Sequence, residues 1–316
     1  MSFITNIEKD EDEITFTINS QNKFKTGFIN GLRRTMISDI PINSISTEKI
    51  NFINNTCMFD NEFLKHRLGL VSIRNNTLED LDDVLLSIDK TNTTDEMISV
   101  YMSDFTVTQR DKPIKNEEII KYPKTLLTKL KPSQHLKLDT TLQIGIGRED
   151  ARFSPVSTAF YHFEYDDDER NYKKDTQKYP LKYIFTIESS GQLEPKQILL
   201  TSINLLQNRL NNIKNDINNK SGKFTEFKKS PTKLDAIDIH LINETDTVGN
   251  LLTQYIMDVP DIKYSGYHMP HPLKKLLILR FSYKDNSIET ITKLISDNID
   301  NINKLLDEFK NECEKL

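Results

Sequence analysis

The chain has 316 residues, of which 36% are hydrophobic and 28% charged, and its net charge at neutral pH is −5. This apolar content excludes an intrinsically disordered chain. The acidic balance argues against a protein that coats nucleic acid, because phosphate binding depends on an excess of Lys and Arg. The length favours about two domains.

The cysteines and the lengths of the apolar runs indicate the kinds of site and the cellular environment to expect for this protein. Cys57 and Cys313 lie far apart and neither belongs to a C-x2-C pair, so we expect no disulfide, zinc site or iron–sulfur cluster. Residues 1–12 lack the basic start and apolar core of a signal peptide. No run approaches the roughly 18 apolar residues that span a membrane. The sequence therefore predicts an intracellular, soluble protein.

The first part of the chain predicts a strand, a helix and a β-rich region. Ile14–Ile18 alternates apolar and polar residues, which indicates a strand. From Phe24 to Met36 an aromatic or aliphatic residue recurs every fourth position, which predicts an amphipathic helix that ends before Pro41. Residues 42–180 are β-like runs and turns, closed by an acidic segment at Glu164–Glu169. The β-like runs are Ile45–Ile53, Met97–Val107, Leu136–Ile146 and Thr158–Tyr165.

A second strand and a long helix follow. Tyr183–Ile187 is typical of a strand, and Pro195 opens the helix, because proline is tolerated in a first turn. The apolar residues of this helix are spaced 4, 3, 4, 3 and 4 apart, which predicts a seam that packs against another helix. They are Leu199, Ile203, Leu206, Leu210, Ile213 and Ile217. Residues 218–233, rich in Lys, Ser and Asn, are interpreted as a linker.

The C-terminal part repeats the same order of elements. Ala236–Leu241 alternates as a strand, and Thr245 or Asp246 is expected to cap a helix that ends at Pro260. Leu276–Phe281 predicts another strand. The apolar positions of a final helix are Ile288, Ile291, Ile295, Ile302, Leu305 and Phe309.

The order strand, helix ending at proline, strand, long helix thus occurs twice. An offset of 219 residues (Pro41 to Pro260) places Asp39 over Asp258 without a gap. We therefore predict an α+β fold in which two half-domains pack as an intramolecular pseudo-dimer. The predicted parts are a first half-domain (1–41 and 181–217), a mostly β insertion domain (42–180), a linker (218–233) and a second half-domain (234–316). The predicted packing residues are Leu199, Ile203, Leu206, Leu210, Ile213, Ile291, Ile295, Ile302, Leu305 and Phe309.

Pairing between two copies of the chain stays open at this stage. A flexible linker of about 15 residues spans about 20 Å, so pairing within one chain is easily reached.

Several motifs have ordinary structural explanations. His66-Arg67-Leu68-Gly69-Leu70 is compatible with a short helix that Gly69 caps, with His66 and Arg67 facing solvent. His268 and His271 lack a third nearby metal ligand. The Gly145-Ile-Gly147 stretch lacks the third glycine of a dinucleotide fingerprint and is interpreted as a turn.

Two alternatives remain beside these explanations. Asp166-Asp167-Asp168 is compatible with a divalent cation site, used by an enzyme together with His162 or His135, although no phosphate-binding loop accompanies it. A nucleic-acid-binding protein that uses basic residues around 218–233 is the other alternative, with an affinity that falls steeply with salt.

One family accounts for the remaining motifs. Asn30-Gly-Leu-Arg33-Arg34, followed by Asp39-Ile-Pro41, resembles the first-helix motif of α-type assembly subunits of multisubunit DNA-dependent RNA polymerases. The segment that ends in His66-Arg67-Leu68-Gly69-Leu70 resembles the HRLGL segment of the third-largest subunit of eukaryotic and archaeal polymerases. Similar stretches of that subunit match 147–156 and 185–191. Residues 243–252 and 264–273 resemble the small subunit that pairs with it.

The resemblance implies a non-catalytic subunit on which the two large catalytic subunits assemble for transcription. It implies a fusion of two partner subunits, a pattern of large DNA viruses, with the host cytoplasm, the virion or the nucleus as location. Contact with the large subunits, chiefly the second-largest, is implied for Asn30, Arg33, Arg34, His66, Arg67, Leu68, Gly69 and Leu70.

The family pattern also sets what we do not expect. We expect no catalytic residue, metal or cofactor. We also expect no direct base-specific contact with nucleic acid and no membrane as a partner. The insertion domain has only Cys57 where the cellular subunit often carries a cysteine-rich metal loop, and no separate DNA-binding domain is expected after the final helix.

Overall fold

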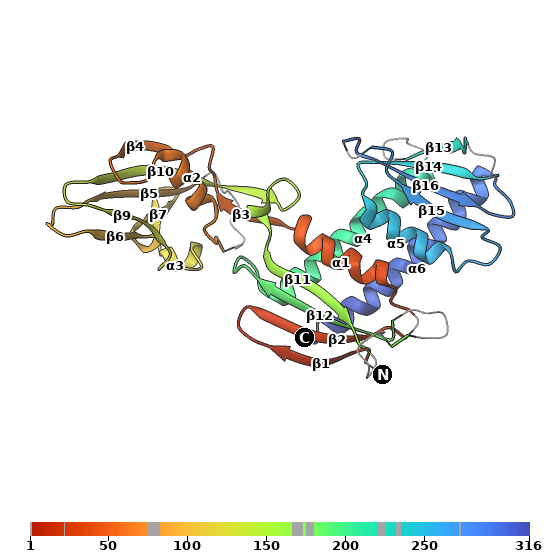
Figure 1. Ribbon diagram of the computed structural model, residues 1–316. Helices are drawn as coiled ribbons and strands as arrows, with labels where there is room; N and C mark the ends of the chain where they lie inside the picture. The colour runs from red at the N-terminus through yellow and green to blue at the C-terminus, as the bar shows by residue number, and fades with distance from the viewer. Residues whose placement is uncertain are drawn as a thin grey trace. The chain divides into compact units, whose positions relative to one another are not determined.

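A computed structural model describes residues 2–21, 23–74, 83–165, 173–174, 180–219, 225–231, 235–271 and 273–316. The chain divides into two compact units (Figure 1). The first unit comprises Met1–Met36, Thr158–Ile187 and Lys196–Leu316, and the second comprises Ile37–Ser157 and Glu188–Pro195. Helices and sheets both occur, which confirms the α+β class. Within the described residues, no helix is long and apolar enough to cross a membrane.

One sheet of the first unit has the strand order β1-β2-β12-β11. Its strands are β1 (Ile4–Lys9), β2 (Glu13–Asn19), β12 (Lys182–Ser189) and β11 (Val156–Phe163). The sequence predicts β2 and β12 but misses β1. Only Ile4 of β1 is buried, and the register shifts between Thr5 and Glu8, so the alternation that would reveal an edge strand is broken.

The two predicted helices of the first half-domain form as expected. Helix α1 (Thr26–Ser38) buries Phe28, Leu32 and Met36 and ends shortly before Pro41. Helix α4 (Pro195–Asn219) begins at the predicted proline. The whole predicted seam of α4 is at most 2% exposed.

The second half-domain forms a sheet of order β13-β14-β16-β15 with two helices. Its elements are β13 (Thr225–Lys229), β14 (Ile237–Ile242), α5 (Asp246–Ile256), β15 (Tyr264–His268), β16 (Leu276–Ser282) and α6 (Ile288–Cys313). Strand β13 lies inside the range interpreted as a linker. It ends in two lysines, but it pairs with β14, and the buried Thr225 donates a hydrogen bond to Asp216 Oδ2 at 2.6 Å.

The long helices α4 and α6 face each other in the first unit. Lys214 Nζ lies 2.5 Å from Asp300 Oδ1, and Gln207 Nε2 donates to Asp307 Oδ1 at 2.7 Å. Below these polar pairs, Phe309 of α6 packs against Phe24 and Phe28 of the first half-domain, with ring centroids 5.6 Å apart in both pairs. The two half-domains therefore pack as an intramolecular pseudo-dimer.

One predicted packing position of α6 needs correction. Leu305 is only partly buried, whereas Ile299 and Leu306 are fully buried. Steps of three and four residues keep the buried positions on one face of a helix with 3.6 residues per turn, and after the three-residue step from Ile299 to Ile302 the next step is four, to Leu306. The buried apolar residues of α6 are Ile291, Ile295, Ile299, Ile302, Leu306 and Phe309.

The second unit is mostly β-structure. One sheet has the order β3-β10-β5-β7-β8, with β4 also paired to β10, and β6 pairs with β9 separately. The strands are β3 (Pro41–Ile45), β4 (Asn51–Asn55), β5 (Val84–Thr91), β6 (Ile98–Tyr101), β7 (Thr106–Gln109), β8 (Lys112–Ile114), β9 (Leu126–Leu130) and β10 (His135–Ile146). The helices are α2 (Asn61–Gly69) and α3 (Asn116–Ile119).

Two predicted β-like runs of this unit are each broken in the structure. Only the ends of the run Ile45–Ile53 are strand, because β3 ends at Ile45 and β4 begins at Asn51, and the two strands pair with different stretches of β10. The run Met97–Val107 is interrupted by a single 3-10 turn at Met102–Asp104. A continuous apolar pattern does not show where a strand changes partner.

Candidate protein interface

Helix α2 presents two different faces. Asp60 caps its first turn by accepting a hydrogen bond from the Phe63 amide at 2.8 Å. Leu64 and Leu68, four residues apart, are fully buried in the core of the second unit. The opposite face carries Phe63, His66 and Leu70, spaced three and four residues apart.

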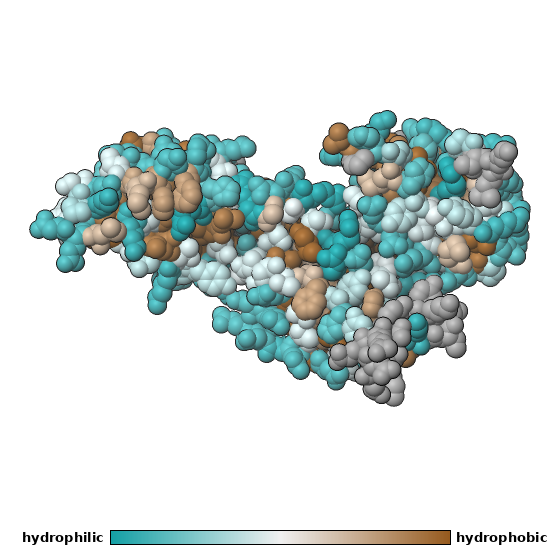
Figure 2. Space-filling model, viewed as in Figure 1, coloured by the Kyte–Doolittle hydropathy of each residue, from teal (hydrophilic) through white to brown (hydrophobic). Residues whose placement is uncertain are grey.

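We call Phe63, His66 and Leu70 the α2 stripe. Phe63 is 49% exposed, Leu70 is 63% exposed, and His66 is also exposed. The ring of Phe63 packs at a tilt against that of Phe59, with centroids 4.5 Å apart, while about half of the Phe63 side chain faces water. Aromatic and aliphatic side chains aligned on one exposed helix face are typical of a protein interface. Figure 2 shows tan and brown apolar areas on a surface that is otherwise mostly hydrophilic or intermediate.

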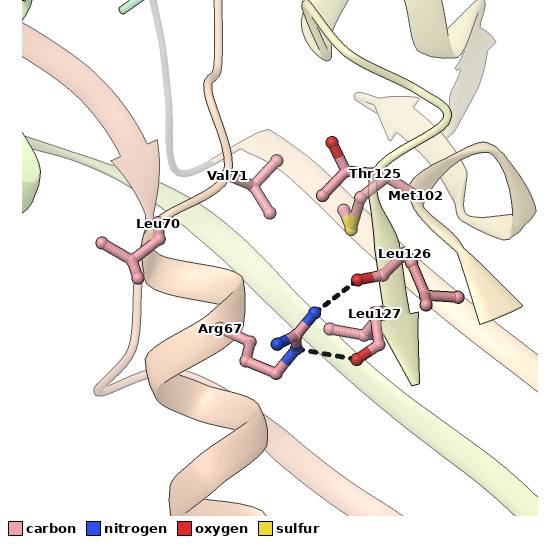
Figure 3. A pocket seen from close by; sticks show the side chains of 7 residues that line it. All are labelled: Arg67, Leu70, Val71, Met102, Thr125, Leu126 and Leu127. Atoms are coloured by element: carbon pink, nitrogen blue, oxygen red, sulfur yellow. Dashed lines mark hydrogen bonds between the residues drawn. The ribbon is translucent and has the colours of Figure 1, made fainter. Parts of the chain in front are cut away.

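Arg67 anchors α2 to strand β9. Its Nε donates to the Leu127 carbonyl at 2.8 Å, and its Nη2 donates to the Leu126 carbonyl at 2.6 Å (Figure 3). A pocket of about 170 Å³ lies beside the guanidinium. It is lined by Arg67, Leu70, Val71, Met102, Thr125, Leu126 and Leu127. The sequence predicts Arg67 as a partner contact, whereas its donors hold the helix in position.

Leu68 and Gly69 support the stripe from inside. Leu68 is fully buried, so its side chain contacts the core and no partner surface. Gly69 is the last helical residue, and the C-cap that the sequence predicts at Gly69 is the next residue, Leu70, with φ −92°. A Cβ on Gly69 would lie 2.9 Å from Thr47 Cγ2 and 3.1 Å from Arg152 Nη1. Glycine is needed there for close approach.

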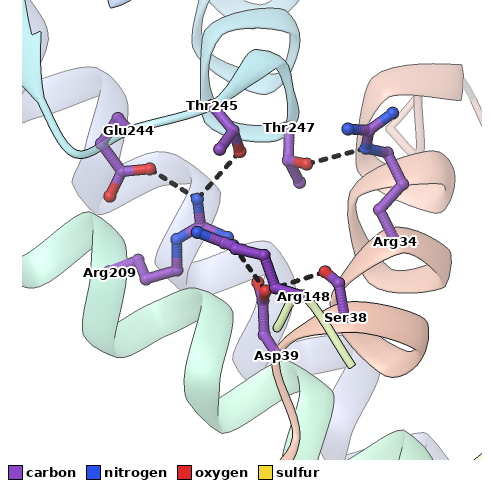
Figure 4. Close-up of polar contacts among 8 residues, drawn as sticks. All are labelled: Arg34, Ser38, Asp39, Arg148, Arg209, Glu244, Thr245 and Thr247. Carbon is purple, nitrogen blue, oxygen red and sulfur yellow. Dashed lines mark hydrogen bonds and ion pairs between the residues drawn. The ribbon is translucent and has the colours of Figure 1, made fainter. Parts of the chain in front are cut away.

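The predicted contact residues of α1 lie in the first unit, and some of their donors form hydrogen bonds within the chain. Arg33 Nε donates to Asn30 Oδ1 at 2.9 Å, along one helix face. Arg34 Nε donates to Thr247 Oγ1 of α5 at 2.9 Å (Figure 4). Arg34 is exposed and Arg33 is half-buried. Arg34 therefore joins the two half-domains as well as facing solvent.

A second arginine of the first half-domain meets the start of α5. Arg209 Nη2 of α4 donates to Glu244 Oε2 at 2.5 Å and to Thr245 Oγ1 at 3.2 Å (Figure 4). Thr245 is the N-cap of α5, one of the two predicted caps, but its side chain makes no capping hydrogen bond. The contact with Arg209 uses the same hydroxyl.

The glycines of the predicted turn serve close packing in the second unit. Gly145 lies in β10, not in a turn, and a Cβ there would lie 2.5 Å from the Phe153 ring. A Cβ on Gly147 would lie 2.1 Å from the Ile37 carbonyl oxygen. The Gly-x-Gly pattern reflects this packing.

The residues of the enzyme alternative are placed as follows. Asp166, Asp167 and Asp168 lie outside the described residues. His135 Nε2 lies 2.7 Å from Asp89 Oδ1 on the surface of the second unit, and His162 stacks with Phe160 at 6.3 Å in the first. In the ranges that the structure describes, no three His, Cys, Asp or Glu side chains are grouped to hold a metal ion.

Two paired α+β half-domains, one interrupted by a β-rich insertion, define a dimerisation module. A family model described as the RNA polymerase Rpb3/Rpb11 dimerisation domain matches residues 20–210, more than half of the chain. A second model of the same description matches residues 236–312. The chain belongs to the RNA polymerase Rpb3/Rpb11 dimerisation-domain family.

Curated relatives agree with this family. The DNA-directed RNA polymerase subunit Rpo3 of Methanocaldococcus jannaschii is 26% identical over 187 residues, which are 59% of this chain and 83% of that protein. The RPAC1 subunit of RNA polymerases I and III from Saccharomyces cerevisiae is 26% identical over 276 residues, covering 60% of this chain and 81% of its own. An RNA polymerase subunit from Acanthamoeba polyphaga mimivirus is 28% identical over 177 residues, 56% of this chain and 44% of its own.

Proposed function

We propose that this chain is a non-catalytic subunit of a multisubunit DNA-directed RNA polymerase and the platform on which the two large catalytic subunits assemble. The observation that carries the proposal is the presence of two dimerisation-domain matches in one chain. Their helices α1, α4, α5 and α6 pair inside one compact unit. A module of this kind offers a rigid surface to larger subunits, and the relatives are named as polymerase subunits.

The domain organisation is part of the proposal. The first half-domain (1–41 and 181–217) corresponds to a third-largest-subunit-like part, and the second (234–316) to its small partner. The insertion (42–180) and the linker (218–233) complete this organisation, although Thr158–Ile187 groups with the first unit and strand β13 lies within 218–233. Separate family matches at 20–210 and 236–312 support a fusion of the two partners. The mimivirus relative supports a viral source, with the host cytoplasm, virion or nucleus as its place of action.

The α2 stripe is the proposed contact with the large subunits, chiefly the second-largest. The exposure of His66 and Leu70 supports the role that the sequence suggested for them, and we include the exposed Phe63 in the same proposal. Arg67 positions the stripe through the β9 carbonyls. Because α2 is packed through Leu64 and Leu68, the stripe is preorganised and a partner need not order it.

The α1 residues form a second proposed contact. Arg33 and Arg34 each carry a planar fork of donors suited to carboxylates or carbonyls of a partner. Asn30 orients Arg33 through the hydrogen bond between their side chains. A double variant, Arg33→Ala/Arg34→Ala, is expected to weaken large-subunit binding.

Affinity purification of the tagged full chain from the cell that makes it, followed by mass spectrometry, tests the function. Two stoichiometric partners, each several times longer than this chain, are expected. Recovery of the chain without such partners would refute the assembly role.

A matched pair of variants tests the α2 stripe in the same purification. The triple variant Phe63→Ala/His66→Ala/Leu70→Ala removes the exposed side chains and is expected to lower large-subunit affinity about tenfold or more. Ile53→Ala/Met97→Ala changes two apolar residues of the same unit that are equally exposed. Equal recovery of the large subunits with both variants would exclude the α2 stripe as a contact.

A further inference from the structure

A buried lysine joins the N-terminal end of α1 to the C-terminal end of α5. The Lys25 side chain is only 4% exposed, and its ammonium forms an ion pair with Asp258, whose side chain is 54% exposed. Lys25 Nζ also donates to the Gln254 carbonyl at 2.8 Å and lies 5.3 Å from the centre of the Tyr255 ring. Burying an ammonium is costly unless it is paired and hydrogen-bonded, so Lys25 depends on these groups of the second half-domain.

Hydrogen bonds between side chains of α5 and the main chain around Lys25 link the same junction. Tyr255 Oη donates to the Lys23 carbonyl at 2.7 Å, and the Gly27 amide donates to Gln254 Oε1 at 2.7 Å. A Cβ on Gly27 would lie 2.6 Å from that amide oxygen. The cation of Lys25 is therefore held at one fixed place against α5.

The two helices run antiparallel at this junction. Lys25, at the start of α1, meets Asp258 after the end of α5, whereas Arg34, near the end of α1, meets Thr247 in the first turn of α5. An antiparallel pair of related helices has a pseudo-twofold axis between them. Each contact at one end then has an equivalent at the other, with the half-domains exchanged.

The charges do not follow this pseudo-symmetry. The 219-residue offset that places Asp39 over Asp258 also places Lys25 over Glu244. The first half-domain thus has a cation where the second has an anion. Glu244 is partnered by Arg209, which again belongs to the first half-domain. Glu244 and Asp258 of the second half-domain therefore each form an ion pair with a cation of the first half-domain.

Self-pairing of the second half-domain would remove both cations. In a pair of second half-domains, the antiparallel arrangement would bring Glu244 of each copy toward Asp258 of the other. The two junctions would then each carry a pair of like charges at a site where Lys25 is nearly dry. Glu244 is 13% exposed, so a like charge opposed to it is unfavourable, although water screens part of the repulsion at the half-exposed Asp258.

We propose that Glu244 and Asp258 select a first-type half-domain as partner and prevent the second half-domain from pairing with a copy of itself. Lys25 and Arg209 are the specificity-determining residues that satisfy them. The partner that they select is a half-domain with a buried ammonium at the start of its short helix and a guanidinium on its long helix.

The test uses the full chain, with light scattering after size exclusion and thermal unfolding as readouts. Lys25→Glu replaces the attraction with repulsion and is expected to lower the unfolding midpoint by roughly 10 °C. The charge exchange Lys25→Glu/Asp258→Lys is expected to restore most of that loss. Lys25→Met removes the attraction without adding repulsion, and we expect a smaller loss than with Lys25→Glu.

A matched control lies two residues away. Lys23 pairs with Glu308 at 3.3 Å, and both side chains are 51% exposed, so Lys23→Glu is expected to change the midpoint little. A midpoint for Lys25→Glu equal to that of Lys23→Glu would overturn the proposal, as would a charge exchange no more stable than Lys25→Glu alone.

A gain of self-pairing tests specificity itself. Lys25→Glu/Glu244→Lys makes the second half-domain complementary to itself and repels it from the first. This variant is expected to have a larger average mass than the unchanged chain, because second half-domains then pair between chains. An unchanged mass would overturn the proposal. The proposal does not rest on the polymerase assignment, and none of these measurements involves the large subunits, so the two can fail separately.

Discussion

The aromatic contact between the half-domains gives the sharpest prediction on stability. Phe309 of α6 is fully buried, with ring centroids 5.6 Å from Phe24 and Phe28 and 5.9 Å from Phe3. All three neighbours belong to the first half-domain. Phe309→Ala therefore opens a cavity at the junction of the two repeats.

The expected cost follows from burial. A fully buried Phe→Ala change costs about 3–5 kcal/mol. At about 2–4 °C per kcal/mol for a folding unit of this size, the unfolding midpoint is expected to fall by about 10 °C. Circular dichroism during heating of the full chain measures it.

The same substitution at an exposed phenylalanine is the control. Phe63 is half exposed and contacts Phe59, so Phe63→Ala is expected to change stability by less than about 1 kcal/mol. If Phe309→Ala lowers the unfolding midpoint no more than Phe63→Ala does, the inference that the half-domains pack through this aromatic cluster is wrong.

Two further predictions concern titrating groups. Burial raises the pKa of the Cys313 thiol, whereas Cys57 is partly exposed. A disulfide reagent should therefore react with the Cys57 thiol alone in the folded chain and with both thiols in denaturant. A fast-reacting thiol in the Cys57→Ser variant would contradict this prediction. Hydrogen bonds from Lys137 and His135 lower the pKa of Asp89 below 3.8, so its stabilising contribution is present above pH 3.8 and is lost as the pH falls through the lower folded value. Urea unfolding of Asp89→Asn should therefore differ from the unchanged chain at neutral pH and converge with it in acid, and a constant difference across the acid range would refute the ion pair.

Much of the fold was predictable because its main elements each bury one regular face. The four-residue spacing from Phe24 to Met36 and the seam from Leu199 to Ile217 record that burial directly in the sequence. The candidate site was predictable only as a segment. The motif from His66 to Leu70 indicated the segment that forms α2, but its residues are variously exposed, buried or engaged in anchoring the helix, and the motif does not distinguish them.

The sequence by itself determined the repeat, the class of fold and the family, since periodic burial and motif order are local properties of the chain. The tertiary structure alone decided the edge strands β1 and β13, the close approach at Gly69, the engagement of Arg67 with β9 and the pairing of Lys25 with Asp258. Each of these depends on a group that is distant in sequence and supplies a hydrogen bond, a charge or a packing surface. A lysine reads as a solvated residue until the fold brings a carboxylate to it, and for that reason the contacts that set pairing specificity were invisible in the sequence.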